Sequence, residues 1–143
     1  GAEQRGSAGS AGRFPMKYLL DVNVLLAACH TGHREHARAM RWLADVKGEE
    51  LLTAPITELG FVRIAAASGM QPDVPAARAA LARWTKAAKT RLVADDLGAA
   101  RLPDWADTPA KTTDGHLAEL ARAHGAQLAT MDTGIPAALL LPA

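Results

Sequence analysis

Short apolar runs alternate with longer amphipathic stretches along most of this chain. The runs are rich in leucine, valine and threonine, have the length of buried strands, and lie at 18–22, 51–54, 92–94, 126–130 and 139–141. The stretches between them repeat apolar residues at helical spacing and predict helices at 24–28, 34–46, 56–68, 74–88 and 114–124. This alternation predicts an α/β fold with a mainly parallel sheet of about five strands, covered by helices on both faces.

Several polar residues stand where these elements are expected to begin. Asn23 is suited to cap the first helix, and Asp73 with Pro75 is suited to open the helix at 74–88. The segment 95–111 has neither helical nor strand periodicity and contains one glycine and two prolines. It therefore predicts a loop that holds a short turn.

Length and composition predict a single soluble domain. The chain has 143 residues, 49% of them hydrophobic and 22% charged, and no apolar run approaches the roughly 20 residues that cross a bilayer. Cys29 is the single cysteine, so no internal disulfide can form, and the chain fits the reducing cytoplasm. Residues 1–15 are rich in glycine, alanine and serine and are interpreted as a disordered leader or cloning remnant, which leaves 16–143 as the folded domain.

Four acidic residues stand where an apolar run gives way to a turn or to a helix start: Asp21, Glu58, Asp114 and Asp132. Parallel strands deliver their carboxyl ends to one edge of a sheet, so carboxylates at these positions are expected to converge. Converging carboxylates repel one another unless a cation lies between them, and ligand sets made only of oxygen suit Mg²⁺ or Mn²⁺. Such ions activate water against a phosphodiester, so the pattern predicts a metal-dependent hydrolase of phosphoryl bonds.

Each of these acids also has an ordinary structural explanation. Asp21 and Asp114 would serve as helix caps. Glu58 would favour a helix N-terminus through the helix dipole, and Asp132 would form a turn. Four independent explanations of this kind are needed to dismiss the cluster. The net charge of +1 does not indicate nucleic acid by itself, although a metal that neutralised the four acids would leave a basic surface.

Three stretches of the chain together resemble a PIN domain, in particular the VapC ribonuclease toxins of bacterial toxin–antitoxin pairs. They are LLDVNVLL at 19–26, ITELGFVR at 56–63, and TDGHLAELA at 113–121, which is followed by LATMD at 128–132. The resemblance extends over residues 16–142. It implies a three-layer α/β/α fold, an RNA substrate, a homodimer, and a small VapB-like antitoxin protein that blocks the site.

The same resemblance implies that an acidic quartet surrounds Mg²⁺ or Mn²⁺ and that polar side chains support it. The quartet would consist of Asp21, Glu58, Asp114 and Asp132, and the supporting residues of Asn23, Thr113 and Thr130. Asp21 and Asp114 are expected to be direct ligands, while Glu58 and Asp132 act through water or on a second ion. The implied activity is that of an endoribonuclease in which metal-activated water attacks the RNA backbone.

Two further surfaces are expected from the sequence. The helices at 56–68 and 74–88 carry Phe61, Ile64 and Trp84, which we expect to form an apolar groove for a partner helix. Basic residues flank the loop at 95–111 and are candidates for phosphate contacts, although a solvated face explains the same spacing. These residues are Lys86, Lys89, Arg91, Arg101 and Lys111.

Three alternative functions are weighed against the nuclease. A haloacid-dehalogenase-type phosphatase also begins with an aspartate after an apolar strand, but it needs a second acid at the position of Asn23. A response-regulator receiver would use Asp95 and Asp96, although its acidic pair belongs after the first strand. A PIN-like module that binds RNA or protein without cutting is disfavoured by the intact quartet, because buried like charges are costly to retain without metal.

The histidines carry less information than the acids. His30, His33 and His36 lie close together in sequence, but no cysteine pair or further histidine at a suitable spacing completes a zinc site. His116 and His124 are expected to lie on the surface or at a helix end.

Overall fold

A five-stranded parallel sheet runs through the middle of the protein in the computed structural model, which describes residues 14–143. The strands are β1 (Lys17–Leu20), β2 (Glu50–Thr53), β3 (Arg91–Leu92), β4 (Gln127–Thr130) and β5 (Leu139–Leu140). Their order is β3-β2-β1-β4-β5, and every neighbouring pair is parallel. The predicted parallel sheet is therefore confirmed, with β1 at its centre.

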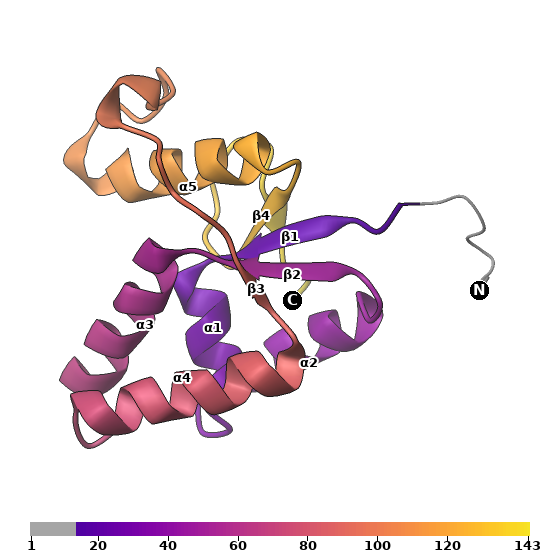
Figure 1. Ribbon diagram of the computed structural model, residues 1–143, viewed down its shortest axis with the longest axis vertical. Helices are drawn as coiled ribbons and strands as arrows, with labels where there is room; N and C mark the ends of the chain where they lie inside the picture. The colour runs from indigo at the N-terminus through magenta and orange to yellow at the C-terminus, as the bar shows by residue number, and fades with distance from the viewer. Residues whose placement is uncertain (1–13) are drawn as a thin grey trace.

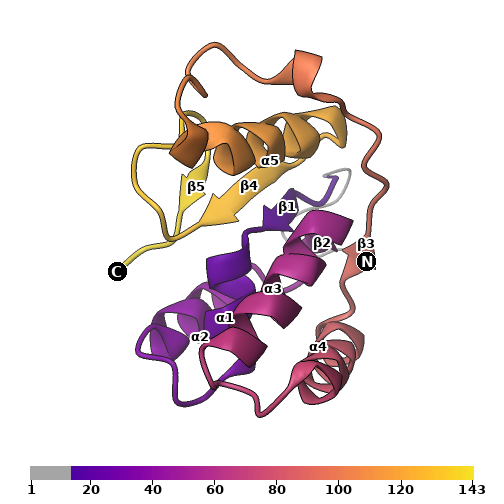
Figure 2. The ribbon, with the colours of Figure 1, turned by 90° about the vertical axis from the view of Figure 1, so that its left-hand side faces the viewer.

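Helices cover both faces of this sheet and make three layers (Figures 1 and 2). The helices are α1 (Val22–Cys29), α2 (His36–Asp45), α3 (Pro55–Ala67), α4 (Val74–Ala88) and α5 (Thr112–Ala123). Helix α5 packs on one face, whereas α1 to α4 lie together on the other. Two 3₁₀ turns, η2 (Ala99–Arg101) and η3 (Pro109–Lys111), interrupt the long connection from β3 to α5. The three-layer α/β/α prediction is confirmed.

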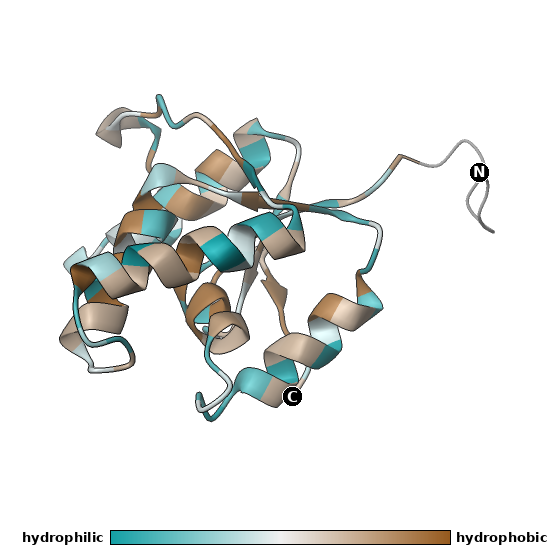
Figure 3. Cartoon of the chain, turned by 60° about the horizontal axis from the view of Figure 1, so that its bottom comes forward, coloured by the Kyte–Doolittle hydropathy of each residue, from teal (hydrophilic) through white to brown (hydrophobic). Residues whose placement is uncertain are grey.

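Alternation along β1 divides the core into two parts. Tyr18 and Leu20 belong to the cluster beneath α1 to α3, whereas Leu19 belongs to the cluster beneath α5, as the two-residue period of a strand requires. On the first side the Tyr18 and Trp42 rings meet edge to face with centroids 5.2 Å apart. In Figure 3 teal and brown residues alternate along the helices.

The boundaries near the first strand differ from the prediction. The strand ends at Leu20 and the helix begins at Val22, so Asp21 is the N-cap and Asn23 lies inside the first turn. The Asp21 carboxylate accepts from its own neighbour, Val22 N, at 2.8 Å. Aspartate and asparagine are nearly equal as caps, and the helix starts where the strand releases the chain.

The remaining boundary differences are small. The third strand lies at 91–92, one residue earlier than predicted at its start, and Val93 N continues the pairing by donating to Thr53 O at 2.8 Å. The predicted cap at Asp73 is confirmed, because its Oδ1 accepts from Ala76 N at 2.8 Å. Residues 1–13 of the predicted leader at 1–15 lie outside the described residues. Among residues 14–143, no helix has the length and apolar character needed to span a bilayer.

Candidate metal centre

Three carboxylates converge at the carboxyl edge of the sheet. Asp21 follows β1, Asp132 follows β4, and Asp114 lies in the first turn of α5, which leads into β4. One oxygen from each residue lies within 4.8 Å of the others. Because β1 and β4 are parallel neighbours, both strand ends deliver their acids to the same place. The three acids therefore meet, as the parallel topology predicted.

The three acids differ in how far solvent reaches them. Asp21 is only 6% exposed, Asp114 is partly buried, and Asp132 is exposed. The group of acids is therefore shielded from solvent at Asp21 and open to solvent at Asp132. A ligand can approach from solvent on that open side and still meet the buried carboxylate.

Thr130 connects the two strand ends that carry Asp21 and Asp132. Its hydroxyl donates to Asp21 Oδ2 at 2.7 Å and accepts from Asp132 N at 3.0 Å. The Asn23 amide completes the connection, with Nδ2 3.5 Å from Thr130 Oγ1 and Oδ1 accepting from Met131 N at 3.3 Å. Thr130 is fully buried, so its hydroxyl fixes the orientation of the Asp21 carboxylate.

Burial and mutual repulsion make the site reluctant to hold its full negative charge without a cation. Burial raises the pKa of Asp21, the charges of Asp132 and Asp114 raise it further, and the hydrogen bonds from Thr130 and Val22 lower it. The pKa of Asp114 is also raised, first by burial and then by the charge of Asp132. A divalent cation between the carboxylates would remove this repulsion.

The donor set fits a hard divalent cation. All three groups offer carboxylate oxygens, which are the ligands that Mg²⁺ and Mn²⁺ prefer over the nitrogen and sulfur ligands chosen by zinc. Three converging carboxylates also leave coordination positions for water or a phosphate oxygen. Among residues 14–143 this is the one group of three or more such side chains close enough to hold a metal ion.

Glu58 lies outside this group of three. It occupies the first turn of α3, as predicted, and its Oε2 accepts a 2.7 Å hydrogen bond from the Thr53 hydroxyl. Thr53 is fully buried at the end of β2, the other neighbour of β1. Glu58 is thus held at the same edge of the sheet, but by a partner that the sequence pattern did not single out.

Thr113, the third residue predicted to support the acids, differs from Asn23 and Thr130. Thr113 is exposed in the first turn of α5, and within residues 14–143 its hydroxyl forms no hydrogen bond. It lines a hollow of about 860 Å³ that runs along α3 and reaches Val22 and Thr113, the chain neighbours of Asp21 and Asp114, without being lined by the acids themselves. The wall next to Asp21 is Val22, and the basic side chain that lines the hollow is Arg63.

The closeness of α3 to the site depends on one glycine. A Cβ atom added to Gly60 would lie 2.9 Å from Val22 Cγ2, which is nearer than real Cβ atoms approach such a neighbour. The helix therefore packs with its backbone against the residue that follows Asp21. This contact sets the width of the hollow beside the acids.

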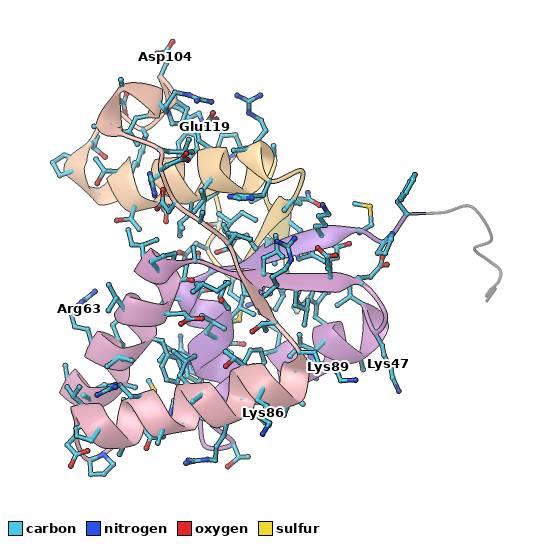
Figure 4. All side chains as sticks on the ribbon, in the orientation of Figure 1. Lys47, Arg63, Lys86, Lys89, Asp104 and Glu119 are labelled. Carbon is cyan, nitrogen blue, oxygen red and sulfur yellow. The ribbon has the colours of Figure 1, made fainter. Side chains whose placement is uncertain are left out.

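Three of the five basic residues considered for phosphate contacts lie around the connection from α4 to β3. Lys86 and Lys89 stand at the end of α4 that leads into β3, far along the molecule from Arg63 (Figure 4). Arg91 opens β3 and pairs with Glu50 at 2.9 Å. The backbone of Arg91 is in register with Leu52 of β2, whereas its side chain is held by Glu50, the first residue of that strand.

The histidines have structural partners. His30 Nδ1 and His36 Nδ1 bond the last carbonyls of α1, Leu26 O at 2.9 Å and Ala27 O at 2.8 Å. His116 was expected at the surface, but its Nε2 lies 2.6 Å from Asp95 Oδ2 and both side chains are largely buried. Sequence spacing gave no signal for this pair, because Asp95 belongs to an irregular segment.

Comparison with known proteins finds a matching family model and several related proteins. A family model described as PIN domain matches residues 18–138. The chain is 39% identical over 127 residues to Ribonuclease VapC39 of Mycobacterium tuberculosis, an alignment that covers 84% of this chain and 91% of that protein. It is 35% identical over 125 residues to Ribonuclease VapC38 of the same organism, with 82% and 86% covered.

A solved structure shares the fold. It is the crystal structure of VapBC2 from Rickettsia felis bound to a DNA fragment from their promoter. The TM-score is 0.58 at 15% sequence identity, and the match covers 87% of this chain and 97% of that one. At this identity the likeness concerns the arrangement of helices and strands.

Proposed function

Because this chain belongs to the PIN domain family and is related throughout the domain to VapC ribonucleases, we propose that it is a metal-dependent endoribonuclease. In this proposal it is the toxin of a toxin–antitoxin pair and hydrolyses RNA phosphodiester bonds. The observation that carries the proposal is the convergence of Asp21, Asp114 and Asp132 within 4.8 Å at the carboxyl edge of the sheet. Nothing else among the described residues offers comparable chemistry.

The acids would hold Mg²⁺ or Mn²⁺. When bound, such an ion supplies activation of water and neutralises charge on the scissile phosphate. Asp21 and Asp114 would be direct ligands, and Asp132 would close the set from the solvent side. Glu58, held by Thr53 outside the trio, would act through water or on a second ion.

The surrounding residues prepare the carboxylates for this role. Val22 N and the Thr130 hydroxyl bond one oxygen each of Asp21, so the carboxylate is fixed before any ligand arrives. The apolar packing beneath Asp21 excludes water from that side, which strengthens electrostatic interactions in the site. The exposed Asp132 marks the direction from which a phosphodiester enters.

The hollow beside the acids would receive the RNA strand. It is bounded next to the site by Val22 and Thr113, and it carries the exposed apolar side chains of Ile56 and Leu59. Arg63 lines it further along α3 and, among residues 14–143, makes no ion pair. Apolar surface for a base and a free guanidinium for a phosphate suit a single strand.

An antitoxin helix would occupy a second groove between α3 and α4, with a volume of about 950 Å³. Exposed apolar side chains line it, among them Leu59 at 71% and Leu92 at 57% exposure. The sequence-based choice of groove residues was wrong. Phe61 is fully buried in the core, and Ile64 and Trp84 pack against the core instead of lining the groove. A groove does lie between the two helices named from the sequence, but it is lined by other residues of α3 and α4, and its occupation by an antitoxin helix is part of this proposal.

A homodimer in the cytoplasm remains our expectation from family membership. Sedimentation equilibrium of the purified protein would measure its assembly state. A monomer at all accessible concentrations would contradict the dimer without affecting the proposed nuclease.

The nuclease is tested with structured RNA, Mg²⁺ or Mn²⁺, and a panel of matched variants. Asp114→Asn removes a ligand charge but keeps the side-chain shape, so cleavage should fall more than about 100-fold while folding survives. Asp104→Asn, an exposed acid in the loop before α5, is the control and should cut like the wild type. Glu58→Gln should reduce cleavage but retain metal binding.

The ends of the products test the reaction itself. Attack by water leaves the ribose 2′-hydroxyl uninvolved, so 5′-phosphate and 3′-hydroxyl ends are expected. Undiminished cutting in EDTA, or 2′,3′-cyclic phosphate ends, would overturn this mechanism. A protein that binds Mn²⁺ but cuts no RNA would favour a binding module without catalysis.

A further inference from the structure

Three consecutive residues at the start of α5 make contacts outside the helix. Asp114 reaches the acid trio, Gly115 is buried against the segment before the helix, and His116 bonds Asp95. We call residues 93–111, which connect β3 to α5, the crossover loop. Two of the three residues thus attach the first turn of α5 to this loop.

The contact at Gly115 is one of close approach. A Cβ atom placed there would lie 2.5 Å from Ala106 Cβ and 3.2 Å from Pro103 Cδ. Any larger residue would push the first turn of α5 away from the crossover loop. Since Asp114 is the preceding residue, the same shift would move its carboxylate relative to Asp21 and Asp132.

The bond between His116 and Asp95 holds this turn from the next position. His116 Nε2 and Asp95 Oδ2 are 2.6 Å apart, and the side chains are 20% and 15% exposed. Asp95 is itself oriented, because its Oδ1 accepts from Leu97 N at 3.2 Å. The N-cap residue of α5 is Lys111, whose side chain makes no capping hydrogen bond. The loop therefore supplies the restraint that a cap would otherwise give.

We propose that Asp95 and His116 are positioning residues for the metal centre, which hold the first turn of α5 so that Asp114 meets Asp21 and Asp132. This inference rests on the proposed metal-dependent function. Neither residue touches the metal; their hydrogen bond acts through the backbone of α5, as outer residues orient ligands in other metal sites. The crossover loop, which lacks long regular elements, thereby takes part in the chemistry of the site.

A second histidine provides a matched control. His124 Nε2 lies 2.8 Å from Ala94 O, so it attaches the same loop to the same helix. It stands eight residues after His116, about 12 Å further along α5 at the usual helical rise. If these bonds only stabilise the fold, loss of either should have similar effects. If the bond at His116 positions Asp114, only its loss should weaken metal binding.

The experiment measures Mn²⁺ affinity by calorimetry and unfolding temperature in EDTA. Asp95→Ala and His116→Ala should each weaken Mn²⁺ binding about 10- to 100-fold, and the double variant should bind no worse than either single one. His124→Ala should bind Mn²⁺ like the wild type. Gly115→Ala should reproduce the loss by displacing the same turn, and Asp95→Asn, which keeps the side-chain size, covers the case in which Asp95→Ala does not fold.

The outcomes separate this inference from the proposed function. Wild-type Mn²⁺ affinity in a folded His116→Ala variant, or an equal loss in His124→Ala, would overturn the positioning role alone. If the wild type did not bind Mn²⁺, or if Asp114→Asn left Mn²⁺ binding unchanged, the proposed metal centre would be wrong, and this inference would be wrong with it.

Discussion

The Thr130 hydroxyl donates a 2.7 Å hydrogen bond to Asp21 Oδ2 across 109 positions of the chain. It joins the end of β4 to the end of β1 with a contact in which both side chains are buried. Asp21 receives its second hydrogen bond from Val22 N. The orientation of the most buried acid therefore depends on one hydroxyl group from the last quarter of the chain.

Thr130→Val should destabilise the protein and disturb the site. The substitution leaves a buried carboxylate oxygen without its donor, which costs about 1–3 kcal/mol in the free energy of unfolding. Urea denaturation at neutral pH in EDTA measures this cost. Thr130→Ser keeps the hydroxyl and should recover most of the stability. Equal stabilities for the valine and serine variants would show that the hydrogen bond carries no net energy.

The metal-free protein should lose stability relative to Asp21→Asn as the pH rises. Burial and the neighbouring acids raise the pKa of Asp21 above its ordinary value of 3.8, so the folded state binds the proton more tightly than the unfolded state. Ionising Asp21 in the folded state therefore lowers the free energy of unfolding. This loss is absent below the pKa of Asp21 in the unfolded chain, grows as the pH rises toward its pKa in the folded protein, and is complete above that value.

Urea midpoints from pH 4 to pH 8 in EDTA would measure the difference between wild type and variant. We expect the variant to be the more stable protein at pH 8, with the difference shrinking toward pH 4. Saturating Mn²⁺ should reverse the order, because only the wild type keeps the full set of ligands. A difference that does not change with pH would contradict the raised pKa.

Arg63→Ala should weaken RNA binding while leaving the chemical step intact. Its guanidinium lines the hollow beside the acids, and loss of one phosphate contact should reduce the slope of log affinity against log salt by about 1. Binding is measured with an Asp114→Asn background so that RNA is not cut. Lys89→Ala, at the end of α4, is the control. An unchanged salt slope for Arg63→Ala would exclude it from the RNA path.

Ala82→Glu should block the antitoxin partner without disturbing the fold. Ala82 is exposed on α4 and lines the groove between α3 and α4, where a glutamate would place charge against an apolar partner face. Ala87→Glu introduces the same residue at an exposed position of the same helix outside the groove. Co-purification with the protein encoded by the neighbouring gene should fail for the first variant alone. Equal recovery of the partner with both variants would show that it binds outside this groove.

The sequence was most informative where strand ends alone determine position. The acids at 21 and 132 follow neighbouring parallel strands, so their meeting follows from topology without knowledge of side-chain packing. The acid at 114 joins them because its helix leads directly into β4. These relationships depend on backbone direction, which alternating strands and helices predict well.

Side-chain partners were harder to predict, because several residues could serve the same purpose. Asp21 and Asn23 are both good caps, and sequence alone does not decide between them. Phe61 lies on a helix with apolar residues on several sides, so periodicity does not indicate which side is buried. The partner of His116 comes from a segment without periodicity, and only the folded chain brings Asp95 to it.

The pairing of β1 with β4 has a consequence for synthesis of the protein. The ribosome produces Asp21 well before Thr130 and Asp132, since 109 positions separate Asp21 from Thr130. At about 5–20 residues per second, the nascent chain carries Asp21 for roughly 5 to 20 s before its partner exists. A truncated product that ends before β4 lacks both Thr130 and Asp132. In the proposed mechanism such a product would lack one ligand of the metal centre and the hydroxyl that orients another, so it would not cut RNA.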